Sequence, residues 1–585
     1  MDDWNAISID LMQGLSNLEE LEIKNCGGIQ EVIKLEGLLT ITGEQQDLLL
    51  PRFKKMLLID LHELRCIWKG ATKLINLNIL EDLKVIRCKK LTHLFTLALA
   101  QSLQKLKFLE IGSCDELEHL IVENVEEQVF PKSHPQPLCF PKPCLVKIWV
   151  YGCNKLKCLF NVDRWIPVSI ILTLEELEIG NCGGLQGVFS FEGLLTREGE
   201  QQDEFFPRLR KICLVELHEL MYIWKGPIQL VNLNNLEDLE VIECKKLTHL
   251  FTPALAQSLQ RLKFLEIKRC DELEHLIVEN AEEQVLSKSH LQSLCFPKPC
   301  LTKIWVNGCN KLKCLFHVDR WIPVSIIFTL EQLEIDNCGG LQEVFNFEGL
   351  LTREGEQQDE FFPRLSKMCL VNLHELMYIW KGPIQLVNVN NLEDLKVIRC
   401  KKLTHLFTPA LAQSLQKLKF LEIRRCDELE HLIVENVEEQ VSSESHLQPL
   451  CFPKLKIVNV GYCNKLKYLF PMTIADSLLE LKLLAVKENS QLMEVFTYEG
   501  DAGVQKVVTL PQLEFMGLKG LPSLVNFCPK NYQFTLPKLW ELRVESCKNM
   551  RTTFTRTPDR SVLINGEVIQ YSFFFFFFLI ICSLN

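Results

Sequence analysis

Apolar residues recur along most of this chain in one short pattern, first seen as Leu18-x-x-Leu21-x-Ile23-x-x-Cys26-x-x-Ile29. The alternation at Leu21 and Ile23 predicts a short strand whose two apolar side chains face inward, while the polar residues beside them face solvent. The position three residues after the strand, held here by Cys26, returns with every copy of the pattern. The chain is therefore predicted to form a series of short strands, each followed by a turn and a further apolar pair.

The unit is itself copied in larger blocks, because Cys26, Cys182 and Cys338 recur at intervals of 156 residues. The first block has predicted strand cores at Leu21–Ile23, Met56–Leu58, Leu83–Val85, Leu109–Ile111 and Ile148–Val150. We divide the chain into an incomplete N-terminal cap (1–17), three blocks (18–173, 174–329 and 330–480), a diverged fourth block (481–555) and a non-repeat tail (556–585). The tail contains a run of Phe at 573–578 and is expected to be disordered or non-native. The alternative interpretation of the tail is a weak membrane anchor, but its apolar run is about half the length that a membrane-spanning helix needs.

This period and pattern match the leucine-rich repeat, a unit that buries its apolar face only by stacking on its neighbours. We predict an α/β repeat fold: a curved leucine-rich repeat solenoid of about eighteen repeats. Parallel strands should line the concave face, with mostly irregular chain or short helical turns, such as one within 97–106, on the convex face. The polar insertions at 123–137 and 193–207 are expected to bulge from the convex side or the rims.

Twenty-five cysteines raise the alternative of a disulfide scaffold, but their positions favour free thiols. Thirteen share one position of the unit and should stack as a buried ladder of small apolar side chains, which Asn489 and Leu518 continue in the diverged block. These are Cys26, Cys88, Cys114, Cys153, Cys182, Cys244, Cys270, Cys309, Cys338, Cys400, Cys426, Cys463 and Cys547. No C-x-x-C and no N-x-[ST] occurs, and the first residues lack the apolar run of a signal peptide. These features favour a reducing, cytoplasmic location.

Composition and motifs argue against several other functions. A net charge of −11 disfavours nucleic acid as the main ligand. No phosphate-binding loop, nucleophile elbow or kinase signature is present, so we expect no enzyme and no cofactor. His93 and His119 each follow a ladder cysteine by five residues, but one such pair supplies too few ligands for a metal. We therefore interpret these histidines as exposed turn residues and expect no metal.

Copies of the block differ mainly at exposed positions, which indicates a surface that could be tuned for a protein ligand. Lys84 becomes Glu240 and then Lys396, and similar changes affect Lys24, Arg87, Gly112, Ser113, Tyr151 and their counterparts. Trp149 and Trp305 project from the same face, and exposed Trp is a frequent interface anchor. The candidate protein-binding residues on the concave surface are Lys84, Arg87, Trp149, Tyr151, Glu240, Glu243, Lys268, Arg269, Trp305, Asn307, Lys396, Arg399, Arg424 and Arg425. The alternative is drift at solvated positions, with the Trp residues packed on neighbouring loops.

The unit resembles the C-terminal leucine-rich repeats of plant intracellular immune receptors of the coiled-coil, nucleotide-binding class. LEDLKVIRCKKLTHLF (80–95) and FPRLRKICLVELHELMYIWKG (206–226) carry the resemblance, which covers about residues 15–555. It implies a sensor that binds a pathogen effector or a guarded host protein and that, in a full-length receptor, contacts its own nucleotide-binding domain. That domain and the coiled coil are absent from this sequence, so a fragment, a truncated product or a decoy is expected.

Two alternatives remain. Leucine-rich repeats also serve as substrate receptors of ubiquitin ligases, but residues 1–17 are too short for an adaptor-binding helical motif. A truncated or pseudogene product without signalling activity is the other. The preferred interpretation is a non-enzymatic protein-recognition module in plant defence, and membrane association is not expected.

Overall fold

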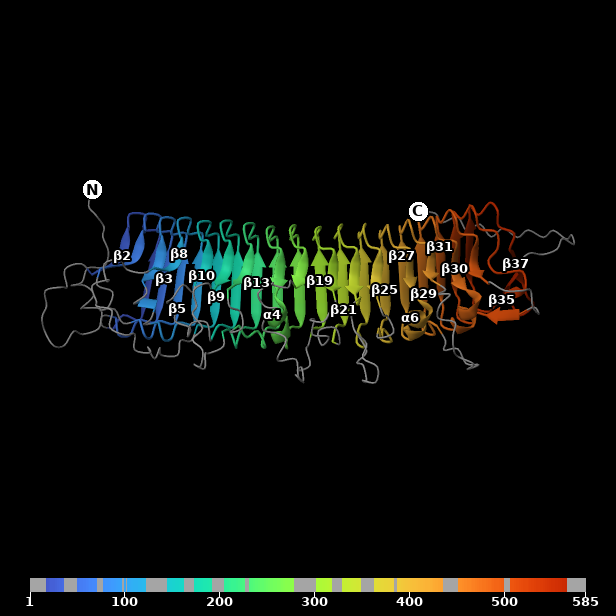
Figure 1. The fold of residues 1–585 in the computed structure, drawn as a ribbon, viewed down its shortest axis with the longest axis horizontal. Helices are drawn as coiled ribbons and strands as arrows, with labels where there is room; N and C mark the ends of the chain where they lie inside the picture. The colour runs from blue at the N-terminus through green and yellow to red at the C-terminus, as the bar shows by residue number, and fades with distance from the viewer. Residues whose placement is uncertain are drawn as a thin grey trace. The chain divides into compact units, whose positions relative to one another are not determined.

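Every predicted strand core of the first block lies inside a five-residue strand of the computed structural model (Figure 1). The structure describes residues 17–35, 50–70, 77–96, 99–100, 103–122, 145–161, 173–191, 205–226, 231–277, 301–317, 329–348, 362–382, 387–434, 451–498 and 506–565. Two units are present, Met1–Val389 and Asn390–Asn585, and each is described by itself. The expected loops at 123–137 and most of 193–207 lie outside the described residues, as do the N-terminal cap before residue 17 and the run of Phe.

The first unit contains a parallel sheet of strands that we call the concave strands. Neighbours pair in register, so that Leu21 lies opposite Met56 and Ile23 opposite Leu58. The strands are β1 (Glu20–Lys24), β3 (Lys55–Ile59), β5 (Asp82–Ile86), β7 (Phe108–Gly112), β9 (Lys147–Tyr151), β11 (Glu176–Gly180), β13 (Lys211–Val215), β15 (Asp238–Ile242), β17 (Phe264–Lys268), β19 (Lys303–Asn307), β21 (Gln332–Asp336) and β23 (Lys367–Val371).

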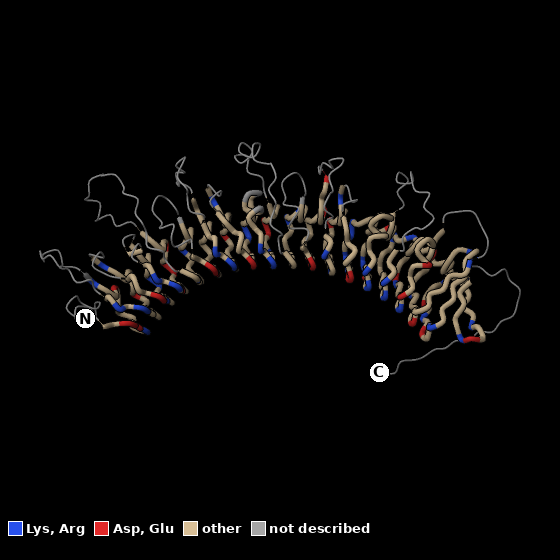
Figure 2. Tube along the Cα trace, turned by 90° about the horizontal axis from the view of Figure 1, so that it is seen from below, with Lys and Arg blue, Asp and Glu red and all other residues tan. Residues whose placement is uncertain are grey.

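The second unit repeats this arrangement. Its concave strands are β25 (Asp394–Ile398), β27 (Phe420–Arg424), β29 (Ile457–Gly461), β31 (Leu483–Lys487), β34 (Phe515–Lys519) and β36 (Glu541–Glu545). Within the described residues the concave strands of the two units number 18, as expected from the repeats. In each unit the concave strands lie on the inner side of the bend and carry charges of both signs (Figure 2).

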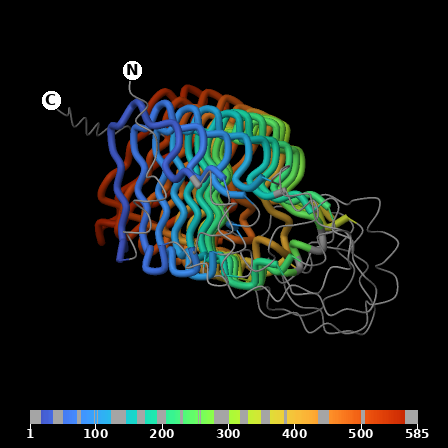
Figure 3. The backbone as a smooth tube through the Cα atoms, turned by 90° about the vertical axis from the view of Figure 1, so that its left-hand side faces the viewer, coloured from blue at the N-terminus to red at the C-terminus, as the bar shows by residue number. Residues whose placement is uncertain are grey.

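The alternation in the sequence determines which side chains form the core. In β5 the second and fourth residues, Leu83 and Val85, are fully buried, while the first, third and fifth are partly exposed. Each buried aliphatic side chain contributes about 1.5–3 kcal/mol, and each repeat obtains this burial only from its neighbours. Seen along the stack, each repeat is one turn of the chain (Figure 3).

A left-handed residue follows each concave strand, at what we call the sixth position. Arg87 has φ 56° there, and its N–H donates to the carbonyl of Gly112 in the next repeat at 2.7 Å. Glu243 (φ 56°) and Arg425 (φ 56°) make the same bond to Lys268 and Gly461. The conformation costs about 1 kcal/mol for a residue with a Cβ, and the bond it allows joins consecutive repeats. This turn was not predictable from residue type, because most of these residues are neither Gly nor Asn.

The residue after the left-handed turn forms the predicted ladder. Cys88, Cys114 and the other interior ladder cysteines are fully buried, and every described cysteine is free. The prediction is wrong at the ends of the ladder, because Cys26 is exposed and Cys547 is partly exposed where no further described repeat covers them. It is also wrong for Leu518, which lies inside β34. The left-handed residue there is Gly520, so Leu521 occupies the ladder.

A second strand of three to five residues, not expected from the sequence, follows the ladder in nearly every described repeat. In the first unit these are β2 (Glu31–Leu35), β4 (Cys66–Gly70), β6 (His93–Thr96), β8 (His119–Val122), β10 (Cys158–Asn161), β12 (Gly187–Ser190), β14 (Tyr222–Lys225), β16 (His249–Phe251), β18 (His275–Ile277), β20 (Cys314–His317), β22 (Glu343–Asn346) and β24 (Tyr378–Lys381). In the second unit they are β26 (His405–Phe407), β28 (His431–Ile433), β30 (Tyr468–Pro471) and β32 (Glu494–Thr497), while β33 (Lys506–Thr509) and β35 (Tyr532–Leu536) lie later in their repeats and belong to a separate sheet. They pair into small sheets and place aromatic side chains in the core, such as Phe189 stacked on Trp224 at 4.9 Å.

Helix is sparse in the described residues, as expected. The predicted helical turn of the first block is partly outside the described residues, but its counterparts are α4 (Pro253–Ser258) and α6 (Pro409–Ser414). Thr252 and Thr408 cap these helices by accepting the N–H of Leu255 and Leu411, and each has Pro in the first helical position. A 3-10 helix, η7 (Met472–Ser477), follows β30 (Tyr468–Pro471) at the end of the third block, as α6 follows β26.

The end of the second unit corrects the predicted tail. β37 (Thr553–Arg556) and β38 (Val562–Asn565) form an antiparallel hairpin, and β38 also pairs with β35. Residues 556–565 therefore belong to the fold and are not part of a disordered tail. The antiparallel strand β38 provides hydrogen-bond partners for backbone groups of β35 and β37, where no further parallel strand pairs with them.

Candidate protein-binding surface

The structure places all the predicted surface residues on the concave strands or at the turn that follows them. Third strand positions hold Lys84, Trp149, Glu240, Trp305 and Lys396. Fifth strand positions hold Tyr151, Lys268, Asn307 and Arg424, and left-handed sixth positions hold Arg87, Glu243, Arg269, Arg399 and Arg425. Those numbered up to 307 belong to the first unit and the other four to the second, so we treat them as two separate surfaces.

In the first block, Lys84 lies in a small polar and aromatic cluster. Its ammonium forms an ion pair with Glu110 of the next strand at 2.9 Å and lies 5.0 Å from the centre of the Phe108 ring. Trp149 meets Phe108 edge to face with ring centres 5.0 Å apart, so it packs on its own sheet as well as facing outward. The indole N–H of Trp149 is shielded and has no hydrogen-bond partner.

Fifth positions of neighbouring strands are matched in size. Tyr151 lies opposite Gly112, and a Cβ on Gly112 would meet Tyr151 Cζ at 2.1 Å. The second copy pairs Lys268 with Asn307. The third copy pairs Arg424 with Gly461, where a large residue again faces glycine. The differences between copies at these two positions therefore compensate each other.

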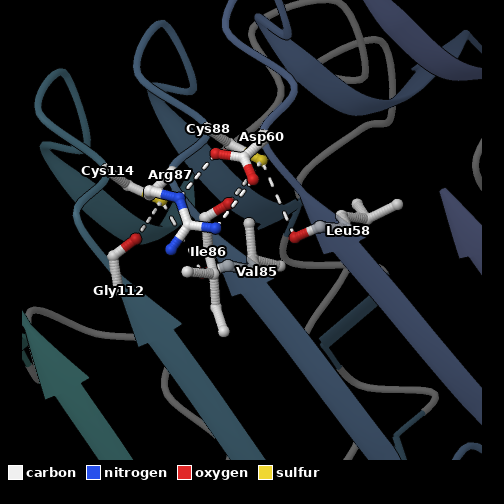
Figure 4. Close-up of polar contacts among 8 residues, drawn as sticks. All are labelled: Leu58, Asp60, Val85, Ile86, Arg87, Cys88, Gly112 and Cys114. Atoms are coloured by element: carbon white, nitrogen blue, oxygen red, sulfur yellow. Dashed lines mark hydrogen bonds and ion pairs between the residues drawn. The ribbon is translucent and has the colours of Figure 1, made fainter. Parts of the chain in front are cut away.

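The sixth positions form a row of charges beside the ladder. Arg87 holds Asp60 with two hydrogen bonds, Nε to Oδ1 at 2.5 Å and Nη2 to Oδ2 at 2.7 Å (Figure 4). The hydrogen bonds from Arg87 keep the pKa of Asp60 below its usual value. In the second copy Glu243 takes the place of Arg87 and pairs with Arg269. The change of charge between copies thus selects a different ion-pair partner.

The second copy neutralises its other charges locally. Glu240 lies 3.6 Å from Lys211 and accepts a hydrogen bond from the thiol of Cys213 at 3.4 Å. Lys268 pairs with Glu266 and lies 3.8 Å from the centre of the Trp305 ring. The Lys211–Glu240 pair is partly exposed and contributes about 0–1 kcal/mol, whereas Glu266 is buried, so the Lys268–Glu266 pair is shielded from solvent.

The surface of the second unit combines an ion pair with an exposed cation–aromatic contact. In the second unit Arg424 pairs with Glu422 at 3.0 Å, while the Arg425 guanidinium lies 5.5 Å from the centre of the Tyr462 ring. Tyr462 is 45% exposed. Arg425 and Tyr462 therefore present a cationic and an aromatic group together, a combination common at protein interfaces.

The histidines correct one prediction. His93 and His119 are not turn residues but begin the second strands β6 and β8, where they lie opposite each other. Desolvation and the neighbouring His119 lower the pKa of His93, which is partly buried. The same pairing occurs at His249 with His275 and at His405 with His431. Among the described residues no group of three or more His, Cys, Asp or Glu side chains is placed to hold a metal ion.

Comparison with protein families identifies the repeats that carry these surfaces. The family model "Plant disease resistance protein RPS2-like, leucine-rich repeats" matches residues 3–115, 116–271, 272–427 and 428–563. The chain belongs to this family. The plant disease-resistance repeats therefore extend over nearly the whole sequence, and the predicted family is confirmed. A leucine-rich repeat region of this kind is typically a non-catalytic protein-binding module.

Other comparisons add little to this family assignment. No curated protein matches the chain. A crystal structure of a TLR13-ssRNA13 complex aligns with 13% identity over 86% of this chain and 84% of that one, with a TM-score of 0.18. The mouse RP105/MD-1 complex aligns with 14% identity over 86% of this chain and 90% of that one, with a TM-score of 0.22. Scores this low support no conclusion about this member of the disease-resistance family.

Within the part of this disease-resistance chain that the structure describes, no helix is long and apolar enough to cross a membrane. One group of outward residues on this face was not expected from the sequence, namely the first residues of β27, β29, β31 and β34. Comparison of the 156-residue copies could not reveal them, because three of the four lie where the third block shortens or the fourth diverges. Alignment of single repeats on the ladder position would have shown them.

Proposed function

We propose that this chain is the protein-recognition region of a plant disease-resistance receptor and is not an enzyme. Its partner is a pathogen effector or a host protein that the receptor guards, and recognition takes place in the cytoplasm. In a full-length receptor the repeats would also contact that receptor's nucleotide-binding domain.

One observation carries this proposal. The copied blocks keep their buried residues and change their concave residues in matched sets, such as Gly112 with Tyr151 and Lys268 with Asn307. Independent drift would leave clashes or gaps between strands, whereas matched changes keep the surface packed while its charge and shape change. A surface that varies in this way on a constant core is suited to distinguishing protein partners.

Affinity capture with the full chain as bait, from plant tissue and from pathogen extracts, tests the proposal. Charge reversal at each surface should reduce capture of a specific partner about tenfold or more, because charge complementarity selects partners. The variants are Glu240→Lys with Glu243→Lys in the first unit and Lys396→Glu with Arg399→Glu in the second.

Two matched controls change charge away from the concave strands. Lys313→Glu lies just before β20 in the first unit and Lys506→Glu lies in β33 of the second, and both residues are exposed. Capture should change less than about twofold in the controls. If both double variants bind every specific partner as the unmodified chain does, the proposal that these concave residues recognise the partner is wrong.

A further inference from the structure

Four neighbouring concave strands of the second unit begin with an apolar residue that faces solvent. These residues, which we call the apolar stripe, are Phe420, Ile457, Leu483 and Phe515. They lie in register across β27, β29, β31 and β34. Phe420 is 41% exposed and the other three are partly exposed. With about 4.8 Å between strands, the stripe extends about 14 Å across the sheet.

The first unit has no comparable stripe in its described residues. Phe108 stands between Asp82 and Lys147 in the register, and Phe264 between Asp238 and Lys303. Each phenyl ring there has charged neighbours on both sides. The apolar stripe is therefore a local property of β27 to β34 and does not follow from the repeat pattern, which requires only the second and fourth strand residues to be apolar.

Two small residues lie beside the apolar stripe. At the third strand positions, where the first block has Lys84 and Trp149, β31 and β34 have Ala485 and Gly517. The Phe515 ring lies against Gly517, since a Cβ there would be 3.0 Å from Phe515 Cε1. Ala485 is only 4% exposed and the Phe515 ring covers Gly517, so neighbouring side chains already fill much of the space above these two residues.

Basic residues frame the apolar stripe on both sides. Lys419, Lys456 and Lys482 immediately precede β27, β29 and β31. At the other end of these strands lie Arg424, Arg425, Lys487 and Lys519. On the same strands and adjoining positions the acidic residues are only Glu422, Glu488 and Glu514. Acidic side chains of adjoining segments also reach this surface, because Lys419 pairs with Glu393, Lys456 with Glu480 and Lys519 with Glu545. The seven basic groups named thus exceed these six acidic ones by one.

Several of these basic groups already form exposed ion pairs. Lys482 lies 3.3 Å from Glu514, and Lys519 lies 2.7 Å from Glu545. Such pairs contribute little in water, and an incoming carboxylate can share the cation. Lys419, Lys456 and Arg424 are paired as well, with Glu393, Glu480 and Glu422. The exposed cations that carry the proposal furthest are Lys487 and Arg425, whose guanidinium lies 5.5 Å from the centre of the Tyr462 ring.

We propose that the apolar stripe and its basic rows form a docking site for an acidic protein segment that carries two or more large apolar side chains. The apolar side chains would cover the stripe, and carboxylates on either side would meet the lysines and arginines. This inference rests on the proposed function, because it specifies the chemistry of the partner. Nucleic acid fits less well, since Ile457 and Leu483 offer no aromatic platform for bases and Glu422 and Glu488 repel phosphates.

Fluorescence anisotropy with the full chain tests the docking site without knowledge of the natural partner. The probe is a labelled peptide of alternating Asp/Glu and Leu/Phe residues. Three comparison probes have Lys in place of Asp/Glu, Ser in place of Leu/Phe, or consist of single-stranded RNA of the same length. The acidic apolar peptide should saturate below about 1 mM, and each comparison probe should bind about tenfold or more weakly.

Variants locate the site on the molecule. Leu483→Ser, Phe420→Ser and Lys487→Glu change side chains that reach solvent. Each should weaken peptide binding about tenfold, because the first two remove an apolar contact with the peptide and the third replaces an attractive charge by a repulsive one. Phe264→Ser is the matched control for Phe420→Ser, at the equivalent strand position of the first unit. Lys506→Glu is the control for charge. Both controls should bind within about twofold of the unmodified chain.

Several outcomes would overturn the docking site. These are no saturable binding of the acidic peptide, equal loss in stripe and control variants, and tighter binding of RNA or of the Lys peptide. A chain dimer that Leu483→Ser dissociates in sedimentation experiments would assign the stripe to self-association instead. Capture of a specific partner that depends on Glu240 and Glu243 but not on the stripe would leave the proposed function intact and refute only this site.

Discussion

Tyr151 lies over Gly112 of the preceding concave strand, so closely that a Cβ on Gly112 would be 2.1 Å from Tyr151 Cζ. The two residues are partners in the register of β7 and β9. Their equivalents in the next copy are Lys268 and Asn307. Outward-facing positions of this solenoid are thus coupled across strands, although neither residue belongs to the core pattern.

Gly112→Lys is expected to destabilise the first unit by about 1–3 kcal/mol, because the Tyr151 ring must leave its place. The double variant Gly112→Lys with Tyr151→Asn recreates the pair of the second copy and should recover most of the loss. Chemical denaturation of the four proteins of this cycle gives the coupling, expected at about 0.5–3 kcal/mol. Effects that simply add would mean that the two positions vary independently.

The left-handed turn predicts a strong dependence on side-chain shape at the sixth position. Gly308 has φ +70°, and a Cβ there would meet Arg269 Cγ only at an ordinary contact distance of 3.4 Å. Gly308→Val should therefore destabilise through backbone conformation, by about 1–2 kcal/mol, and Gly308→Asn by much less. Thermal unfolding of both variants measures the difference. Equal melting temperatures would show that the turn is not under this constraint.

The paired histidines predict a loss of stability in mild acid. Burial lowers the pKa of His93, His249 and His405, so the folded state favours their neutral forms. Unfolded histidines bind protons first as pH falls below about 6.5, so stability is full above that pH and declines as pH drops toward the lowered folded pKa values.

The measurement is the urea midpoint between about pH 8 and 5.5. Replacement of the three residues by Gln should flatten the dependence on pH. His62→Gln, at an exposed histidine, is the control and should keep the slope of the unmodified chain. A triple variant with that same slope would assign the acid sensitivity to other groups.

The ladder predicts which thiols react in the folded protein. Burial raises the pKa of Cys244 to about 12, whereas Cys26 is exposed. Iodoacetamide at about pH 8 should modify Cys26 rapidly and Cys244 only after denaturation, since the thiolate is the reactive form. Peptide mapping by mass spectrometry gives the extent at each site. Labelling of Cys244 in the native protein at the rate of Cys26 would contradict a closed core.

The concave strands and the ladder were predictable because their signal is local. Alternation at Leu83 and Val85 and the cysteine at position 88 recur in each copy, and burial follows directly from them. The second strands were missed because a run such as His-Leu-Phe at 249–251 is short and places adjacent Leu250 and Phe251 both in the core. Alternation therefore fails there, and only the neighbouring repeat supplies the strand pairing.

The sequence by itself determined the solenoid, the family resemblance and the concave position of the candidate residues, because each follows from a pattern within one repeat or from comparison of its copies. The tertiary structure decided which exposed side chains meet. Phe420, Ile457 and Leu483 form a stripe only because their strands pair in register. Arg87 reaches Asp60 only because the left-handed turn brings consecutive repeats together. Contacts between repeats depend on strand register and backbone conformation, and these are fixed when the repeats stack.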